Sequence, residues 1–230
     1  MDLDVGEWLC VGPYCWEATP ALLAFAAATL HALAAVIPTR VRVRRWARYR
    51  VDLDQAPPPP DIPLTPVTEE LLPLLEEHAG VDADQLNSGL RFWRHGLRRA
   101  YVWLGEDGPR CVQWLLTRPD APQLRTLEAW AGMYPPLRPQ WGQVENLFTF
   151  PAARQKGVAT QFEYALYREA RRAGVSRLLT HIYEQNSAAR GWADRTGWRQ
   201  CGNITRYEFD LPGLRRSSVC LHWASVPARG

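Results

Sequence analysis

The sequence predicts an α/β (α+β) protein, in which a main domain of strands and helices follows an N-terminal arm of one helix and one strand. Three observations lead to this prediction. In the main part of the chain, apolar residues recur in turn with the two-residue period of strands and the 3.6-residue period of helices. An apolar strand at 142–150 enters a glycine-containing turn and then an amphipathic helix at 158–173. The proline-rich segment 56–66 separates the arm, residues 1–55, from the main domain, residues 61–230.

The composition excludes several classes of protein. At 230 residues, the chain is long enough to bury a core without disulfides or metals. A hydrophobic fraction of 47% and a charged fraction of 22% exclude a disordered chain and a multi-span membrane protein. The five cysteines favour free thiols in a reducing compartment, the cytoplasm, over a disulfide framework. Cys10 and Cys15 are close, but no second Cys/His pair has ligand spacing, so we expect no metal.

The positive charge of the chain is concentrated in one short segment. Six arginines lie between residues 40 and 50, and no acid lies among them. The net charge is +3, and without those six arginines it is −3. The basic character therefore belongs to one segment and does not indicate a nucleic-acid-binding face. We expect no nucleic-acid partner.

The arm begins with an uncharged helix at 20–37. Thr19 can cap it, Pro20 suits its first position, and Pro38 ends it. The acidic residues before the helix are not those of a signal peptide. One side of the predicted helix is an apolar stripe and another is a ridge of alanines: Leu22, Leu23, Ala26, Leu30, Leu33 and Ile37, and Ala24, Ala28, Ala32 and Ala35. Packing on protein is the favoured interpretation, with homodimerisation or membrane association as alternatives.

A strand at 41–53 follows, with apolar and basic residues in alternation. The apolar side is Val41, Val43, Ala47, Tyr49, Val51 and Leu53, and the other side is Arg42, Arg44, Trp46, Arg48 and Arg50. This pattern predicts a half-buried strand with a basic outer face. That face is either a solvated edge or a contact for anions or lipid headgroups. The second interpretation makes residues 21–50 a peripheral contact at the inner face of a membrane.

The elements expected in the main domain follow from periodicity and from the residues that end them. They are a strand at 62–67, a helix from Thr68, a helix at 83–98, a hairpin at 101–117, a Trp/Pro-rich loop at 119–139, the strand 142–150, the helix 158–173 closed by Gly174, a strand at 177–183, a helix at 187–196 closed by Gly197, and strands at 204–211 and 218–224.

The turn RQKGVA, residues 154–159, carries the chemistry most clearly. Backbone N–H groups in the first turn of a helix lack intrahelical partners, and the helix dipole makes them attractive to anions. Gly157 lets a ligand approach the backbone, and Arg154 and Lys156 add positive charge. The turn therefore predicts a site that fits a pyrophosphate. Taken alone, it is also compatible with a plain strand–turn–helix connection.

A second stretch makes the prediction specific. Residues 186–198 read N-x-x-A and then glycine with an aromatic residue at the end of a short helix. Together with R-x-x-G-x-A at 154–159, and in this order, it resembles the GNAT superfamily of acyl-CoA-dependent N-acyltransferases. The resemblance covers about residues 61–210. It implies a mixed central sheet that splays near its middle and is flanked by helices.

The resemblance also implies an acyl-CoA co-substrate, with acetyl-CoA the expected one, and an amine acceptor. The acceptor would be a small molecule or a precursor linked to a lipid or a saccharide. The implied CoA site uses the backbone of a strand, the turn after it, and the later asparagine motif. These residues are Leu147, Phe148 and Thr149 for pantetheine, Arg154, Gln155, Lys156, Gly157, Val158, Ala159 and Thr160 for the pyrophosphate, and Asn186 and Ala189 beside the pantetheine.

The catalytic residues are less well specified. The family often places a base on the strand before the turn, and Glu145 is the only acid there. Period-two alternation puts Glu145 on one face with Gln143, Leu147 and Thr149. Ala193 occupies the position of the family's usual thiol-protonating tyrosine.

That departure leaves three sources for the proton on the leaving thiolate. Tyr183 and Tyr207 are the candidate acids, and water is the third source. His181 is a spare base candidate, although a lone histidine on a strand is more often a core residue.

The acceptor side is expected at the aromatic loop before the strand of the base. Trp130, Tyr134 and Trp141 could form a hydrophobic pocket or lid there, or the loop could pack down on the sheet. The leading function is acyl transfer to an amine. A non-catalytic acyl-CoA-binding or regulatory module and a membrane-surface long-chain N-acyltransferase are the alternatives.

Overall fold

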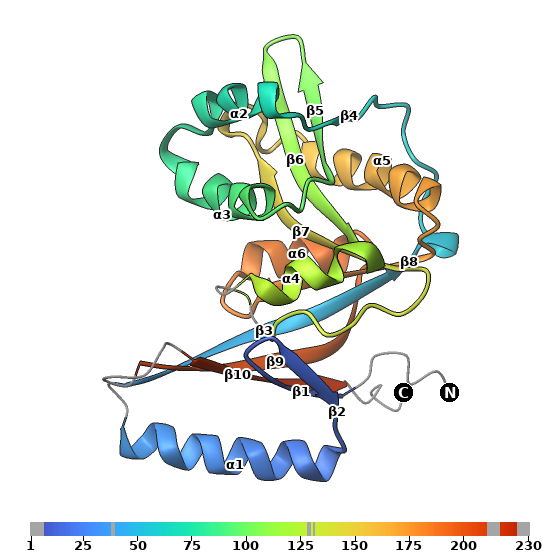
Figure 1. Cartoon of the computed structure of the whole chain (residues 1–230). Helices are drawn as coiled ribbons and strands as arrows, with labels where there is room; N and C mark the ends of the chain where they lie inside the picture. Colours follow the sequence, from blue (N-terminus) through green and yellow to red (C-terminus); the bar gives the residue numbers. More distant parts are fainter. Residues whose placement is uncertain (1–6, 38–39, 128–129, 131, 211–216, 225–230) are drawn as a thin grey trace. The chain divides into compact units, whose positions relative to one another are not determined.

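The computed structural model describes residues 7–37, 40–127, 130, 132–210 and 217–224. The chain divides into two compact units (Figure 1). Unit 1 comprises Met1–Arg50, Leu124–Pro136 and His181–Gly230, and unit 2 comprises Val51–Gln123 and Leu137–Thr180. The proposed division of the sequence into arm, linker and main domain stays a prediction.

Unit 2 is built on a mixed sheet, as the sequence predicted. Its strand order is β8-β7-β6-β5-β4. The pairs from β4 to β7 are antiparallel and β7 pairs with β8 in parallel. The strands are β4 (Thr65–Pro66), β5 (Ala100–Gly105), β6 (Gly108–Thr117), β7 (Trp141–Thr149) and β8 (Arg177–Tyr183), the last of which crosses the division between the units.

Helices cover both faces of this sheet. Gly89 of α3 lies against the Trp114 ring on one face, and Glu163 of α5 faces Gln113 on the other. Figure 1 shows α2 and α3 on the side of the sheet opposite to α5. The helices are α2 (Leu72–Ala79), α3 (Ala83–Arg94) and α5 (Val158–Arg172), with 3₁₀ turns at Leu53–Gln55, Glu69–Leu71, Gly80–Asp82, Arg118–Asp120 and Pro151–Ala153. A further helix, α4 (Ala121–Thr126), crosses the division between the units.

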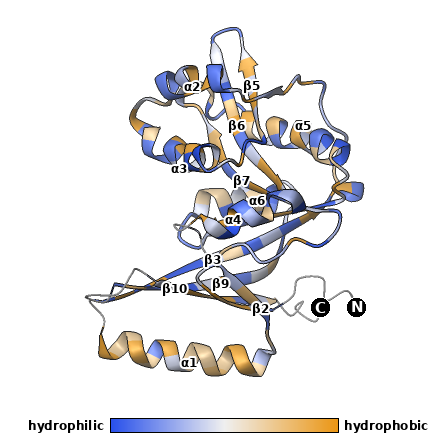
Figure 2. Cartoon of the chain, viewed as in Figure 1, coloured by the Kyte–Doolittle hydropathy of each residue, from blue (hydrophilic) through white to orange (hydrophobic). Residues whose placement is uncertain are grey.

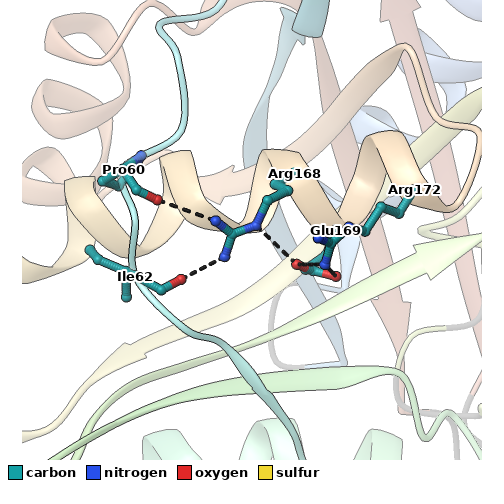
Figure 3. Close-up of polar contacts among 5 residues, drawn as sticks. All are labelled: Pro60, Ile62, Arg168, Glu169 and Arg172. Carbon is teal, nitrogen blue, oxygen red and sulfur yellow. Dashed lines mark hydrogen bonds and ion pairs between the residues drawn. The ribbon is translucent and has the colours of Figure 1, made fainter.

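The proline-rich segment is held against α5. The Arg168 guanidinium donates to the carbonyl oxygens of Pro60 at 3.4 Å and Ile62 at 2.6 Å (Figure 3). Glu169 accepts from Arg168 and from Arg172, so an ion-pair network orients the guanidinium. The proline-rich segment is therefore held along a helix of unit 2.

Unit 1 contains an antiparallel sheet with the strand order β2-β1-β10-β9-β3. The strands are β1 (Trp8–Val11), β2 (Tyr14–Glu17), β3 (Val41–Asp52), β9 (Arg199–Phe209) and β10 (Ser217–Ala224), and the helices are α1 (Pro20–Val36) and α6 (Ser187–Arg195). The end of β3 belongs to unit 2. Leu211, expected in the strand now seen as β9, and Pro38 lie outside the described residues.

Helix α1 packs one side on the sheet of unit 1. The Thr19 hydroxyl accepts from the Leu22 amide, as the predicted cap requires. Leu23 is fully buried in a cluster with Val41, Tyr207, Phe209 and Leu221. The packed side of the helix consists of Leu23, Ala26, Ala27, Leu30, Ala34 and Ile37. The predicted stripe was therefore wrong at Leu22 and Leu33, which lie on its edge and are exposed.

The basic strand departs from simple alternation. Trp46, Ala47, Arg48 and Tyr49 are buried in succession, whereas Val43 is exposed. The register shifts between Arg48 and Tyr49, so a bulge interrupts the pairing with β9. Because both faces of the strand are covered at this point, the prediction that Trp46 and Arg48 belong to a basic outer face was wrong.

Two of the cysteines form a disulfide, which the sequence analysis did not expect. Cys10 and Cys15 are paired positions of the β1–β2 hairpin, with Cα atoms 4.1 Å apart, and they are bonded. The hairpin brings the two thiols together, a consequence of strand pairing that the count of cysteines could not reveal. Among the described residues, no helix is both long and apolar enough to span a bilayer.

Candidate active site

The parallel ladder in unit 2 is short. Among the described residues it joins Trp141, Gly142 and Gln143 of β7 to β8, while β7 itself continues to Thr149. Residues 144–149 of β7 thus extend beyond this ladder. This is the arrangement that an extended ligand needs in order to add to a strand edge.

A bulge in β7 changes which residues share a face. Asn146 has a φ of 56°. Between the same two cross-strand pairs, β6 advances two residues, from Val112 to Trp114, whereas β7 advances three. Glu145 lies opposite Trp114, and Phe148 lies opposite Val112. Because the extra residue inverts the alternation, Glu145 shares a face with Gln143 and Phe148. The prediction that it shares a face with Leu147 and Thr149 was wrong.

Glu145 is held in place by a neighbour on its own strand. The residue is only 8% exposed, and the Gln143 side-chain amide donates to Oε1 at 2.6 Å. An amide N–H bonds best to an ionised carboxylate, which is an acceptor only. The arrangement positions the Glu145 side chain on β7, four residues before the strand ends.

The turn after β7 has the geometry that the sequence predicted. Gly157 caps α5 in the left-handed conformation with a φ of 69°, and the helix begins at Val158. A Cβ atom at Gly157 would have Gln161 Nε2 as its nearest neighbour at 3.9 Å, so the space in front of the helix is open. The first amides of α5 point into that space. They can bind a phosphate with the help of the helix dipole.

The two basic side chains of the turn are engaged within unit 2. Arg154 donates to the Thr149 carbonyl at 3.0 Å and pairs with Asp82 at 2.7 Å. Lys156 donates to the Ala152 carbonyl at 3.0 Å. Because both side chains make these contacts, an anion at the turn would accept hydrogen bonds mainly from the backbone amides. The two positive charges would attract the anion electrostatically.

A buried acid lies on α5 directly beyond this turn. Glu163 is fully buried beside Gln113, and burial raises its pKa to about 8. The same surroundings raise the pKa of the Cys111 thiol, which lies 3.7 Å from the Thr149 hydroxyl. Sequence analysis missed this group, although an acid between the core residues Phe162 and Leu166 was a signal for it.

The asparagine motif lies in unit 1. The Asn186 side-chain oxygen accepts from the Ala189 amide at 3.0 Å and so caps α6. Its amide nitrogen remains the group that could donate to a ligand. Ala193 is fully buried in α6, so this position supplies packing and no acid.

The two candidate tyrosines also lie in unit 1. Tyr183 is part-exposed, with its ring 5.5 Å from Trp46, and borders a hollow of about 220 Å³ with His31 and Arg45. Tyr207 is buried, and its hydroxyl lies 2.6 Å from His31 Nδ1 on α1. Burial raises the pKa of Tyr207.

The aromatic residues expected at the acceptor site fall in two groups. Trp130 and Tyr134 lie in unit 1, with ring centroids 6.4 Å apart, and Tyr134 stacks on His181 at 5.6 Å. Trp141 lies in unit 2, under the guanidiniums of Arg138 and Arg177. It borders a hollow of about 510 Å³ at the C-terminal end of α5, whereas the turn is at the N-terminal end.

Unit 1 also contains a buried basic cluster that the sequence analysis missed. Arg48 is 2% exposed, and burial lowers its pKa to about 10. Two histidines face it. Burial lowers the pKa of His222 to about 3 and lowers that of His181, and the nearby Arg48 charge acts in the same direction. Both histidines are therefore neutral near pH 7, which makes His181 able to accept a proton only at low pH.

Comparison with known proteins assigns the family. The model of the acetyltransferase (GNAT) family matches residues 69–198. The chain belongs to the GNAT family. Members of the family transfer acyl groups and use acetyl-CoA or another acyl-CoA. The match includes the turn at Gly157 and the Asn186 motif but not the N-terminal arm.

Solved structures of GNAT proteins share the fold. One is a unique GCN5-related glucosamine N-acetyltransferase region of a fungal multi-domain GH3 β-N-acetylglucosaminidase, with a TM-score of 0.54 and 13% identity. This chain is covered over 84% of its length and spans 22% of that chain. Another is a GNAT-family acetyltransferase from Colwellia psychrerythraea, with a TM-score of 0.50, 10% identity, and coverage of 94% of this chain and 65% of the other. No curated protein matches this chain.

Proposed function

We propose that this GNAT protein transfers an acetyl group from acetyl-CoA to an amine of a small molecule or of a lipid- or saccharide-linked precursor. The observation that carries the proposal is the left-handed Gly157 between β7 and α5, which opens the first amides of the helix to a phosphate. The motif R-x-x-G-x-A provides this geometry within the matched residues 69–198.

In this proposal, two parts of acetyl-CoA, the pyrophosphate and the pantetheine, contact unit 2. The pyrophosphate would accept from the first amides of α5, at Val158, Ala159 and Thr160, beside Gln155 and the cations of the turn. The pantetheine amides would bond to the backbone of residues 147–149, where β7 continues beyond its ladder with β8. The roles of Asn186 and Ala189 beside the pantetheine rest on the family motif alone.

The proposed reaction is a direct transfer. Glu145 accepts a proton from the acceptor ammonium, and the amine nitrogen then attacks the thioester carbonyl carbon. The C–N bond forms, the C–S bond breaks, and the CoA thiolate takes a proton from Tyr183, Tyr207 or water. The acetylated nitrogen gives its second proton to the phenolate or hydroxide so formed, and Glu145 releases the first proton to solvent. Gln143 is a positioning residue, because its amide holds the Glu145 carboxylate.

The acceptor is proposed to contact the aromatic side chains that the sequence singled out. Trp130 and Tyr134 offer one apolar surface, and Trp141 another. Replacing each by alanine tests this role. A rise in the acceptor KM without a change in that of acetyl-CoA supports it, and an unchanged acceptor KM for all three variants contradicts it.

The test of the function is release of CoA thiol from acetyl-CoA in the presence of a panel of primary amines. Turnover with at least one amine, together with saturable acetyl-CoA binding, supports the proposal. Tyr183→Phe and Tyr207→Phe then identify the acid, because loss of the hydroxyl lowers kcat only where it protonates the thiolate. A chain that does not bind acetyl-CoA contradicts the proposal.

Ala193 favours a second candidate, a non-catalytic acyl-CoA-binding module. A buried alanine stands where the family usually has its acid. Acetyl-CoA binding without thiol release for any amine, and unchanged by Glu145→Gln, is the result that this candidate predicts.

A further inference from the structure

The exposed large apolar side chains of this protein are concentrated in one part of unit 1. Ten such side chains are exposed among the described residues, and all but Val81 and Tyr183 lie between residues 11 and 43. They are Val11, Tyr14, Trp16, Leu22, Phe25, Leu33, Val36 and Val43. Scattered exposure needs no explanation, but a contiguous cluster marks an interaction surface.

Helix α1 provides the centre of this surface. Its inner side packs on the sheet around Leu23, and its outer side carries Phe25 and Val36, which are 71% and 77% exposed. Intervals of three, eight and three residues, about one or two helical turns, separate Leu22, Phe25, Leu33 and Val36, so these residues line one side of the helix. No charged residue occurs in the helix, and Figure 2 shows it as mainly hydrophobic along its whole length. The polar residue on the outer side is the exposed Thr29, whose hydroxyl donates to the Phe25 carbonyl within the helix, so this side is predominantly apolar toward water.

An aromatic pair lies on the same side of the sheet as α1. Leu9 packs in the core beneath the helix, and Trp16 is its partner on the neighbouring strand. Paired residues share a face, and alternate residues of a strand do so too, which places Tyr14 there as well. The Tyr14 and Trp16 rings stack with centroids 6.2 Å apart. Tyr and Trp are the side chains that favour the boundary between lipid and water.

Positive charge borders the apolar surface. Val41 packs beneath α1, so alternation puts Val43 and Arg45 on the same side of β3. Arg45 is exposed there, and the exposed Arg40 follows α1 closely in the chain. No acid occurs between residues 40 and 51. Such a border complements an anionic surface.

We propose that this surface, formed by α1, Tyr14, Trp16, Arg40 and Arg45, docks on an anionic lipid bilayer, with α1 lying in the plane of the interface. The apolar side chains would enter the boundary between headgroups and acyl chains, and the arginines would contact phosphates. The 17 residues of α1 lie on the membrane and do not cross it. This proposal does not depend on the acyl-transfer reaction.

A bilayer fits the surface better than a second copy of the chain does. Seventeen residues extend for about 25 Å at a helix width of about 10 Å, so α1 itself offers a partner about 250 Å², to which the four side chains around it add at the edges. A stable dimer needs about 800 Å² on each side. A bilayer sets no such threshold, because each apolar side chain that enters it adds its own contribution.

Vesicle sedimentation of the full chain tests the proposal. We expect binding to mixed phosphatidylcholine–phosphatidylglycerol vesicles, weaker binding to pure phosphatidylcholine, and loss of binding as salt is added. Phe25→Glu and Val36→Glu should each lower the vesicle affinity at least tenfold. Val81→Glu is the matched control, because Val81 is 98% exposed in unit 2 and the change adds the same charge. Arg45→Gln should lower affinity for anionic vesicles about fivefold, the factor that corresponds to about 1 kcal/mol.

Three results would overturn the proposal. One is wild-type protein that does not sediment with anionic vesicles. Another is an equal loss of binding in Val81→Glu, which would show that charge alone matters. The third is a dimer mass by light scattering that Phe25→Glu reduces to that of a monomer, without vesicle binding, which would assign the surface to a second copy. Circular dichroism and melting temperature confirm that each variant is folded.

Discussion

Gln143 donates its side-chain amide hydrogen to the Glu145 carboxylate at 2.6 Å, from two residues earlier on the same strand. Neighbours at this spacing share a face, and the bulge at Asn146 begins immediately after them. Gln143 and Glu145 therefore lie on one face of the sheet, whereas the residues after the bulge lie on the face opposite to the one that simple alternation predicts. The hydrogen bond holds the carboxyl group before any ligand binds, and in the proposed reaction this removes part of the entropic cost of aligning the base.

We expect Glu145→Gln to lower kcat about 10²-fold or more at neutral pH, because an amide cannot take the proton of the acceptor ammonium. Gln143→Leu should lower kcat less, since the base remains but its orientation is lost. Steady-state thiol release measures both. Glu69→Gln, an exposed acid of the same unit, should match the wild type. Activity of Glu145→Gln within about threefold of wild type would move the base elsewhere.

Gly157→Asn should weaken acetyl-CoA binding at least tenfold. Asparagine tolerates the left-handed conformation, so the helix still begins in the same way, but its side chain enters the space in front of the first amides. Gly174→Asn provides the matched control at the other end of α5, with a φ of 76° and no neighbour within 4 Å of a Cβ atom. Calorimetric titration with acetyl-CoA compares the two. Equal affinities would remove the turn from the binding site.

Leu23→Ala should lower the free energy of unfolding by about 2–5 kcal/mol, because Leu23 is fully buried between α1 and the sheet. Val36→Ala on the outer side of the same helix should change it by less than about 0.5 kcal/mol. Urea unfolding of both variants measures the difference. Similar losses would mean that α1 does not pack by the side described.

Glu163→Gln should stabilise the protein at alkaline pH. The folded-state pKa of Glu163 is about 8, above its ordinary value of 4.5, so the folded state holds this proton more tightly than the unfolded state does. The contribution of this proton to the free energy of unfolding is fully present below pH 4.5. It is lost as the pH rises through about 8.

The glutamine variant keeps the volume of the side chain and cannot ionise. Its free energy of unfolding should therefore resemble that of the wild type near pH 4 and exceed it near pH 8.5 by a few kcal/mol, at about 1.4 kcal/mol per pKa unit. Urea unfolding across this range tests it. A difference that does not change with pH would show that Glu163 titrates normally.

The sequence by itself determined the features that contiguous residues encode. Thr19 and Pro20 define the start of α1, and Gly157 defines the start of α5, because capping depends on a few neighbouring residues. The turn and the Asn186 motif identified the family in advance, since the close approach of backbone to phosphate allows few residue types. The mixed sheet followed from that resemblance.

Only the tertiary structure decided which side chains meet across distant segments. The bulge at Asn146 depends on pairing with β6, and it reverses the face that alternation assigned beyond Glu145. Arg48 has the pattern of an outer-face residue, yet it is buried because both faces of β3 are covered there. The bond between Cys10 and Cys15 depends on hairpin register. Burial and register are properties of partners brought together by folding, so no local pattern within one segment specifies them.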